Sequence, residues 1–166
     1  MVFFITGPKN SGKTAFVKNL HSALEKAGLE TGGIVSEGEP AGEKKSLYFV
    51  KSLRTGKRMK LLEIGGGPVP DKAGFDFADA VLGKAQNYKT VIIDEFGPLE
   101  AAGVGYGERV MRLSRGHDLI ITVRPALAVT AAELFSHAGT ETLSVENKTP
   151  AELEELARHI IRCLSK

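Results

Sequence analysis

Short apolar runs alternate along the chain with longer segments in which apolar residues recur every three or four positions. Runs of strand length occupy Val2–Thr6, Thr90–Glu95 and Leu119–Val123. Each contains an unbroken apolar stretch rich in branched or aromatic residues, such as Val91–Ile93, which favours strands buried on both faces. Two further strands are expected at Thr31–Glu37 and Glu141–Val145.

The segments between several of these runs have helical periodicity. Residues 13–27 place their apolar side chains on one stripe, and Gly28 follows as a C-terminal stop. Asp76 is a candidate N-cap for the second helix. The further helices are expected at Phe75–Gln86, Glu108–Ser114, Leu127–Ala138 and a terminal segment that opens with the capping box Thr149–Glu152.

The middle of the chain has a different pattern. Ser46–Leu53 and Arg58–Ile64 flank the turn residues 54–57, which predicts an antiparallel hairpin. A turn is expected before it at Gly38–Gly42, and a glycine- and proline-rich loop after it at Gly65–Pro70.

Strands that alternate with helices predict an α/β fold of three layers, with a mostly parallel sheet between helices. The hairpin is then an antiparallel addition to that sheet. The 166 residues fit a single domain, 1–166, and no internal repeat interrupts them.

The first strand leads into a phosphate-binding loop. Residues 7–14 read G-x-x-x-x-G-K-T between a strand and a helix, which is the arrangement that this loop requires. Its backbone N–H groups are expected to point at phosphate oxygens, its lysine to neutralise the β- and γ-phosphates, and its threonine hydroxyl to hold Mg²⁺. The loop residues are Gly7, Pro8, Lys9, Asn10, Ser11, Gly12, Lys13 and Thr14.

A second candidate site lies at the end of the apolar run Thr90–Ile93, where Asp94 and Glu95 follow. Ligands bind at the carboxyl ends of strands in such sheets, so both carboxylates are expected beside the phosphate loop. Adjacent strand residues point to opposite sides, so the two have different roles. Asp94 is the candidate for Mg²⁺, and Glu95 is the candidate for orienting and deprotonating an attacking water.

The strand Leu119–Val123 ends at the same edge of the sheet and brings Thr122 and Arg124 toward the nucleotide. Arg124 is a candidate for contact with the γ-phosphate. The alternatives are that Arg124 is a surface arginine held by a carboxylate, or that an arginine from another chain completes the site.

Composition limits the partners and the cellular compartment that we expect for the protein. The formal net charge of +2 is too small to indicate nucleic acid as an obligate partner. The single cysteine, Cys163, excludes an internal disulfide and is expected to be a packing residue in a reducing compartment. With no apolar run near the ~20 residues that span a bilayer, we expect a cytoplasmic protein without membrane contact.

Taken together, G-P-K-N-S-G-K-T near the start, D-E-F-G-P-L-E in the middle and the hairpin with its T-G-K turn resemble the small P-loop nucleoside-triphosphatase family. The resemblance implies a RecA-like core that hydrolyses ATP, GTP and other nucleoside triphosphates with Mg²⁺. It implies that the loop binds phosphates, that Asp94 serves Mg²⁺ and that Glu95 is the catalytic acidic residue. The family often has a second threonine after G-K-T, whereas Ala15 here offers the α-phosphate only its backbone N–H.

The residues leave two other functions open beside hydrolysis. A small-molecule kinase would use the same loop, with residues 65–74 and the basic hairpin as a lid. A nucleotide-dependent switch would hydrolyse slowly and bind a protein partner that the sequence does not identify. No base-reading motif is visible, and the basic hairpin alone is weak support for nucleic-acid binding; its residues are Arg54, Lys57, Arg58 and Lys60.

Overall fold

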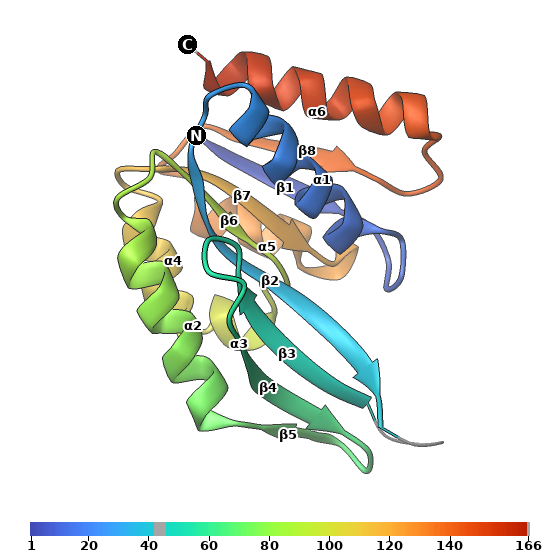
Figure 1. Cartoon of the computed structure of the whole chain (residues 1–166), viewed down its shortest axis with the longest axis vertical. Helices are drawn as coiled ribbons and strands as arrows, with labels where there is room; N and C mark the ends of the chain where they lie inside the picture. The colour runs from blue at the N-terminus through green and yellow to red at the C-terminus, as the bar shows by residue number, and fades with distance from the viewer. Residues whose placement is uncertain (42–45, 166) are drawn as a thin grey trace.

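The structure is a computed structural model that describes residues 1–41 and 46–165. It contains strands and helices in the alternating order that the hydrophobic pattern predicts (Figure 1). The strands are β1 Val2–Thr6, β2 Thr31–Pro40, β3 Ser46–Ser52, β4 Arg58–Ile64, β5 Pro68–Pro70, β6 Thr90–Ile93, β7 Asp118–Val123 and β8 Thr140–Ser144. The helices are α1 Lys13–Lys26, α2 Lys72–Ala85, α3 Pro98–Ala101, α4 Gly107–Leu113, α5 Pro125–Leu134 and α6 Pro150–Leu164.

One sheet contains all the described strands, in the order β5-β4-β3-β2-β6-β7-β1-β8. The strands from β2 to β8 in this order pair in parallel, whereas β3, β4 and β5 pair antiparallel beside β2. The α/β class and the antiparallel hairpin are therefore confirmed. Parallel pairing brings the carboxyl ends of β1, β6 and β7 to one edge of the sheet.

Helices cover both faces of the sheet, so the fold has the three layers that the sequence predicts. Alternate side chains of β1 enter different cores, because successive strand residues face opposite sides. Phe3 and Ile5 pack with α1 and α6, whereas Val2 and Phe4 pack on the side of α2, α4 and α5. Figure 1 shows the two helical layers on either side of the strands.

Two expected breaks between strands are wrong. β2 continues through Pro40 where a turn was expected at residues 38–42, because Ser36 to Pro40 pair in register with β3; residue 42 lies outside the described part. Residues 68–70 form the short strand β5, which pairs with β4, so the expected loop is confined to the glycines before it. Proline tolerates this place because β5 is an edge strand.

The helix boundaries also differ from the expected ones. α2 begins at Lys72, and its N-cap is Asp71, whose side chain accepts a hydrogen bond from the N–H of Ala73 at 3.1 Å; Asp76 is therefore not the cap. The sequence pattern gave no sign of α3, which is a single turn. The capping box at Thr149 is confirmed, since its side chain accepts from the N–H of Glu152.

Among residues 1–41 and 46–165, no helix combines the length and the apolar character that crossing a membrane requires.

Candidate active site

The phosphate-binding loop leaves β1 at Thr6 and enters α1 at Lys13. Asn10 has φ of 63° and Gly12 has φ of 89°, so two positions of this short loop lie in the left-handed region. A Cβ on Gly7 would lie 2.3 Å from the hydroxyl oxygen of Ser11, so a side chain there would displace that hydroxyl. Ala15 is exposed in the first turn of α1.

Lys13 lies under this loop rather than out in solvent. Its side chain is buried, and Nζ donates to the carbonyl oxygens of Gly7 at 2.7 Å and of Pro8 at 2.8 Å. Burial lowers the pKa of Lys13, while the charges of Glu95 and Asp94 oppose that change. An ammonium has three donors, so Nζ retains one for a further acceptor at the loop.

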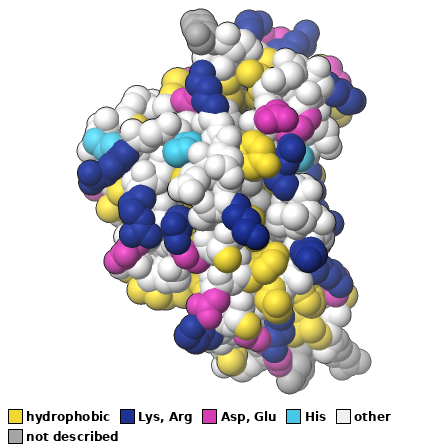
Figure 2. Space-filling view, turned by 60° about the vertical axis from the view of Figure 1, so that its left-hand side comes forward, with side chains coloured by type: hydrophobic (Ala, Val, Ile, Leu, Met, Phe, Trp, Pro, Cys, Tyr) yellow, Lys and Arg dark blue, Asp and Glu magenta, His cyan; other side chains and the backbone are white. Residues whose placement is uncertain are grey.

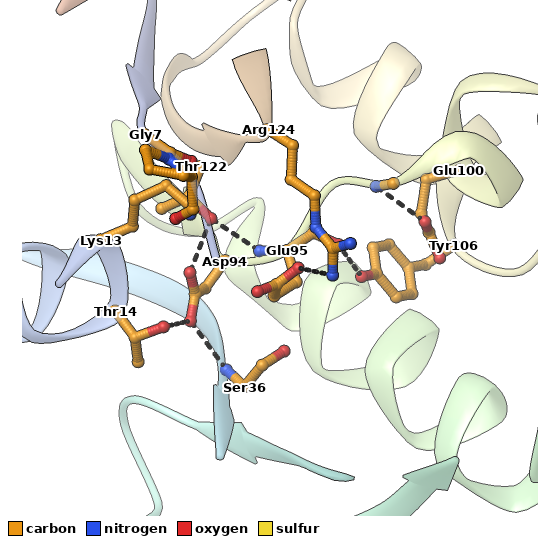
Figure 3. A network of polar contacts seen from close by, with 12 residues as sticks. Gly7, Lys13, Thr14, Ser36, Asp94, Glu95, Glu100, Tyr106, Thr122 and Arg124 are labelled. Carbon is orange, nitrogen blue, oxygen red and sulfur yellow. Dashed lines mark hydrogen bonds and ion pairs between the residues drawn. The ribbon is translucent and has the colours of Figure 1, made fainter. Parts of the chain in front are cut away.

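Asp94 is the centre of the hydrogen-bond network (Figure 3). The residue is 1% exposed. Its Oδ2 accepts from the Thr14 hydroxyl at 2.8 Å and from the backbone N–H of Ser36 at 3.1 Å, while Oδ1 accepts from the Thr122 hydroxyl at 2.6 Å. Four elements of the fold therefore meet at one carboxylate, and the predicted proximity of Asp94 to the phosphate loop is confirmed.

Glu95 follows Asp94 but leaves the strand. β6 ends at Ile93, and Glu95 has φ of 64°, an uncommon conformation for a residue with a side chain. The backbone turn, rather than strand alternation, thus separates the two carboxylates. The N–H of Glu95 donates to the Thr122 hydroxyl at 2.8 Å, which holds this turn in place.

The carboxylate of Glu95 faces Arg124. Arg124 is the N-cap residue of α5, and its Nη2 lies 3.9 Å from Oε2 of Glu95. The side chain of Arg124 is 62% exposed and that of Glu95 is 39% exposed. Arg124 is therefore a surface arginine beside a carboxylate, and that carboxylate belongs to the candidate site.

Two buried side chains lie behind Glu95, and sequence reasoning did not single them out. Tyr106 donates from its hydroxyl to the carbonyl oxygen of Glu95 at 3.3 Å, and burial raises its pKa well above the usual value. Glu100 accepts from the N–H of Gly97 at 2.9 Å, and burial raises its pKa also. Glu100 closes the string D-E-F-G-P-L-E, so the string includes a residue that shapes the turn after Glu95.

A cavity of about 520 Å³ opens over the loop. Glu95 and Arg124 line one side, and the other side comes from β2 and β3, which the sequence did not place near the site. No described residue from 65–74 lines it, so those residues are not a lid over this cavity in the structure. The lining residues are Lys9, Asn10, Ser11, Gly12, Lys13, Thr14, Ser36, Gly38, Glu39, Pro40, Ser46, Tyr48, Glu95 and Arg124.

The donor atoms beside the cavity fit Mg²⁺. Thr14 offers a hydroxyl oxygen to the cavity, and the Asp94 carboxylate lies 2.8 Å behind it. Mg²⁺ prefers hard oxygen ligands and is commonly bound through one or two protein oxygens together with substrate phosphates. Thr14 and Asp94 are thus the residues of this site that suit the ion.

Solved structures with this fold are known. Over 98% of this chain and 96% of the other, the solution structure of a human cancer-related nucleoside triphosphatase superposes with a TM-score of 0.71 at 22% identity. The crystal structure of THEP1 from the hyperthermophile Aquifex aeolicus has a TM-score of 0.76 at 18% identity, over 100% of both chains. At these identities the likeness establishes the fold, a P-loop α/β sandwich.

Two sequence relatives are named nucleoside-triphosphatase THEP1. The chain is 32% identical over 108 residues to nucleoside-triphosphatase THEP1 of Pyrococcus abyssi, and the match covers 60% of each chain. It is 28% identical over 107 residues to nucleoside-triphosphatase THEP1 of Thermofilum pendens, covering 59% of each. The matched stretches thus span about three-fifths of these relatives.

A family model extends over nearly the whole chain. The model of the family described as NTPase matches residues 2–161. This range runs from the first strand, which leads into the phosphate loop, to the terminal helix, and it includes every residue placed at the site above. The chain therefore belongs to the NTPase family, whose members here are small P-loop nucleoside triphosphatases.

Proposed function

We propose that the protein hydrolyses nucleoside 5'-triphosphates, ATP and GTP among them, to the diphosphate and inorganic phosphate with Mg²⁺. The observation that carries the proposal is the convergence on one cavity of a phosphate loop, a buried aspartate and an accessible glutamate. The two neighbouring carboxylates differ in surroundings, since Asp94 is buried and accepts three hydrogen bonds whereas Glu95 is partly exposed. That difference supports a separation into metal binding and water activation.

Residues of the loop would bind the triphosphate. The N–H groups at the start of α1 and the ammonium of Lys13 would meet the phosphate oxygens, with Ala15 contributing its N–H. Thr14 and Asp94 would hold Mg²⁺, whose charge offsets that of the β- and γ-phosphates. Asp94 also accepts two bonds from Thr122 and Ser36, so its carboxylate is fixed before nucleotide arrives.

Glu95 would orient a water for attack on the γ-phosphorus and take its proton. The bond between the γ-phosphorus and the bridging oxygen breaks, and the diphosphate leaves. Arg124, 3.9 Å from Glu95, would stabilise the charge on the transferring phosphoryl group. Two observations support this assignment. The Glu95 carboxylate is partly exposed at the cavity, and it makes no hydrogen bond to Thr14 or Asp94.

A kinase has less support than hydrolysis. The segment 65–74, a candidate lid, contributes β5 at the far edge of the sheet and the start of α2. One side of the cavity comes from β2 and β3 instead, and none of the basic residues of the hairpin lines it. Glu95, the residue that follows the buried Asp94 in the sequence, favours water as the acceptor. A nucleotide-dependent switch would use the same chemistry together with a protein partner.

Nucleic-acid binding has little support. In the basic hairpin, Arg54 pairs with Glu25 at 3.0 Å, Lys60 pairs with Asp71 at 3.3 Å, and Arg58 pairs with Glu39. On the face shown in Figure 2, lysine and arginine side chains are interleaved with acidic ones rather than gathered. That face lacks the contiguous basic patch that binding of a nucleic-acid backbone requires.

The test is phosphate release from ATP, GTP, CTP and UTP, with Mg²⁺ or with EDTA. We expect release from several triphosphates, equimolar diphosphate as the second product, and loss of release in EDTA and in Lys13→Ala. Consumption that depends on an added acceptor, with phosphate found on that acceptor, would replace hydrolysis with kinase activity. Tight binding of triphosphate with no release would exclude hydrolysis and point to a kinase that lacks its acceptor or to a switch that lacks its partner.

A further inference from the structure

Three side chains with metal-binding atoms meet where α6 lies beside β8, apart from the nucleotide cavity. They are Glu141 of β8 and His159 and Cys163 of α6, and one ligand atom of each lies within 4.8 Å of the other two. Nε2 of His159 is 2.8 Å from Oε1 of Glu141 and 3.9 Å from Sγ of Cys163. All three residues are partly exposed.

The packing of α6 and the pairing of β8 fix the positions of these three residues. His159 and Cys163 are four residues apart on α6, so they share one face of the helix. The neighbouring Ile160 and Leu164 are buried in the core shared with α1, which fixes the rotation of α6. Glu141 is fixed by β8, which pairs in parallel with β1. Three ligands from two rigid elements therefore meet without a flexible loop.

The spacing is close to that of a tetrahedral metal centre. With metal bonds of about 2.0–2.1 Å to nitrogen and oxygen and about 2.3 Å to sulfur, ligand atoms in a tetrahedron lie about 3.3–3.6 Å apart. The observed separations of 2.8 and 3.9 Å lie on either side of that range. Shifts of about half an ångström bring these two separations into that range. The ligand atoms of Glu141 and Cys163 lie within 4.8 Å of one another, so this pair would move closer when a metal binds.

We propose that Glu141, His159 and Cys163 form a binding site for Zn²⁺ or another borderline-soft divalent transition metal. Thiolate and imidazole ligands select such ions, in contrast to the oxygen donors Thr14 and Asp94 that suit Mg²⁺. Cys163 binds as the thiolate, so its proton leaves for solvent when the metal enters.

The proposed metal site is distinct from the nucleotide site. Glu141 is in register with Phe3 of β1, whereas the phosphate loop begins after Thr6, three residues and about 10 Å further along the strand. The metal would link α6 to β8, the strand at the edge of the sheet. It would stabilise the terminal helix without taking part in phosphate chemistry, and the proposal does not depend on hydrolysis.

Binding is tested on the full chain without nucleotide, with Zn²⁺ by titration calorimetry and with Co²⁺ by absorption. We expect one Zn²⁺ per chain, a thiolate-to-cobalt charge-transfer band, and a melting temperature about 5–10 °C higher at 100-fold excess over Kd. Mutation of a residue that only hydrogen-bonds to a metal ligand typically weakens metal binding about 10–100-fold. Cys163→Ser and His159→Ala remove a ligand itself, so we expect each to weaken Zn²⁺ binding about 100-fold or more.

Controls separate this site from other metal-binding groups. Glu141→Gln keeps the shape of a surface side chain and removes the charged ligand, so it reports on the site even where a helix variant is unstable. His117→Gln changes a partly exposed histidine whose ring nitrogens contact backbone carbonyls of Leu113 and Gln86, and it is expected to bind Zn²⁺ like the wild type. No stoichiometric binding by the wild type, or equal binding by Cys163→Ser, His159→Ala and Glu141→Gln, would overturn the proposal.

Discussion

The hydroxyl of Thr122 holds the two acidic residues of the site in their relative positions. It donates to Asp94 at 2.6 Å and accepts from the N–H of Glu95 at 2.8 Å. Thr122→Val keeps the shape of this fully buried side chain and removes both bonds. The variant thus changes the network without opening a cavity.

The expected loss follows from the two bonds. A hydrogen bond to a charged group contributes about 1.5–3 kcal/mol, and a buried N–H left without a partner costs about 1–3 kcal/mol. Because both belong to one network they do not add fully, so we expect the free energy of unfolding to fall by about 3 kcal/mol. Glu95 has φ of 64°, a conformation that costs about 1–3 kcal/mol and needs support. Without the Thr122 acceptor its carboxylate shifts, and a displacement of about 1 Å lowers turnover about 10²-fold.

Urea unfolding and steady-state phosphate release measure these two effects separately. Thr122→Ser is the matched control, since it keeps the hydroxyl and loses one methyl group. We expect Thr122→Ser to retain most of the turnover while Thr122→Val does not, with KM changed little in either. Wild-type turnover in Thr122→Val would refute the positioning role, as would equal loss in the serine variant.

Three further changes test other parts of the structure. Arg124→Ala is expected to lower turnover about 10²–10³-fold with little change in nucleotide affinity, measured by phosphate release and by titration; an unchanged rate would leave Arg124 as a surface residue. Burial raises the pKa of Glu100 above 4.5, so its contribution to stability is present at low pH and is lost as pH rises through the raised value. Glu100→Gln does not ionise, so the difference in free energy of unfolding between wild type and variant, measured in urea, is expected to shrink from pH 4.5 to neutrality. A difference that does not change with pH would contradict this. Phe135→Ala removes a fully buried ring that packs edge-on against Phe4 and Phe96, and a loss of about 3–5 kcal/mol is expected by the same method; a loss below 1 kcal/mol would show that the core closes over the gap.

The parts of the fold that the sequence predicts are those with strong local signals. The phosphate loop depends on glycine spacing, and the buried strand before Asp94 depends on an unbroken run of branched residues. Both signals belong to single segments, and they are found at the expected places beside one another. The position of Asp94 at the loop follows from the parallel sheet, so it could be inferred before the structure.

Features that depend on pairing between distant segments were not predictable. β2 continues to Pro40 only because β3 pairs with it, and the glycines and proline there read as a turn in isolation. The N-cap at Asp71 was not predicted, because the glycine- and proline-rich residues before it are typical of a loop rather than of a strand that leads into a helix. The left-handed turn at Glu95 and the two bonds of Thr122 arise from contacts across the sheet, for which a threonine at a strand end is no signal by itself.

Glu95 is the residue on which the proposed hydrolysis most depends. The most direct measurement is single-turnover phosphate release from Mg·ATP by the wild type and Glu95→Gln, with ATP binding measured in parallel. Glu37→Gln, which changes a β2 glutamate paired with Lys18 and Lys51, is the matched control. We expect Glu95→Gln to bind ATP like the wild type and to release phosphate about 10²–10³-fold more slowly. Release at the wild-type rate would contradict the assignment of Glu95 as the group that activates water.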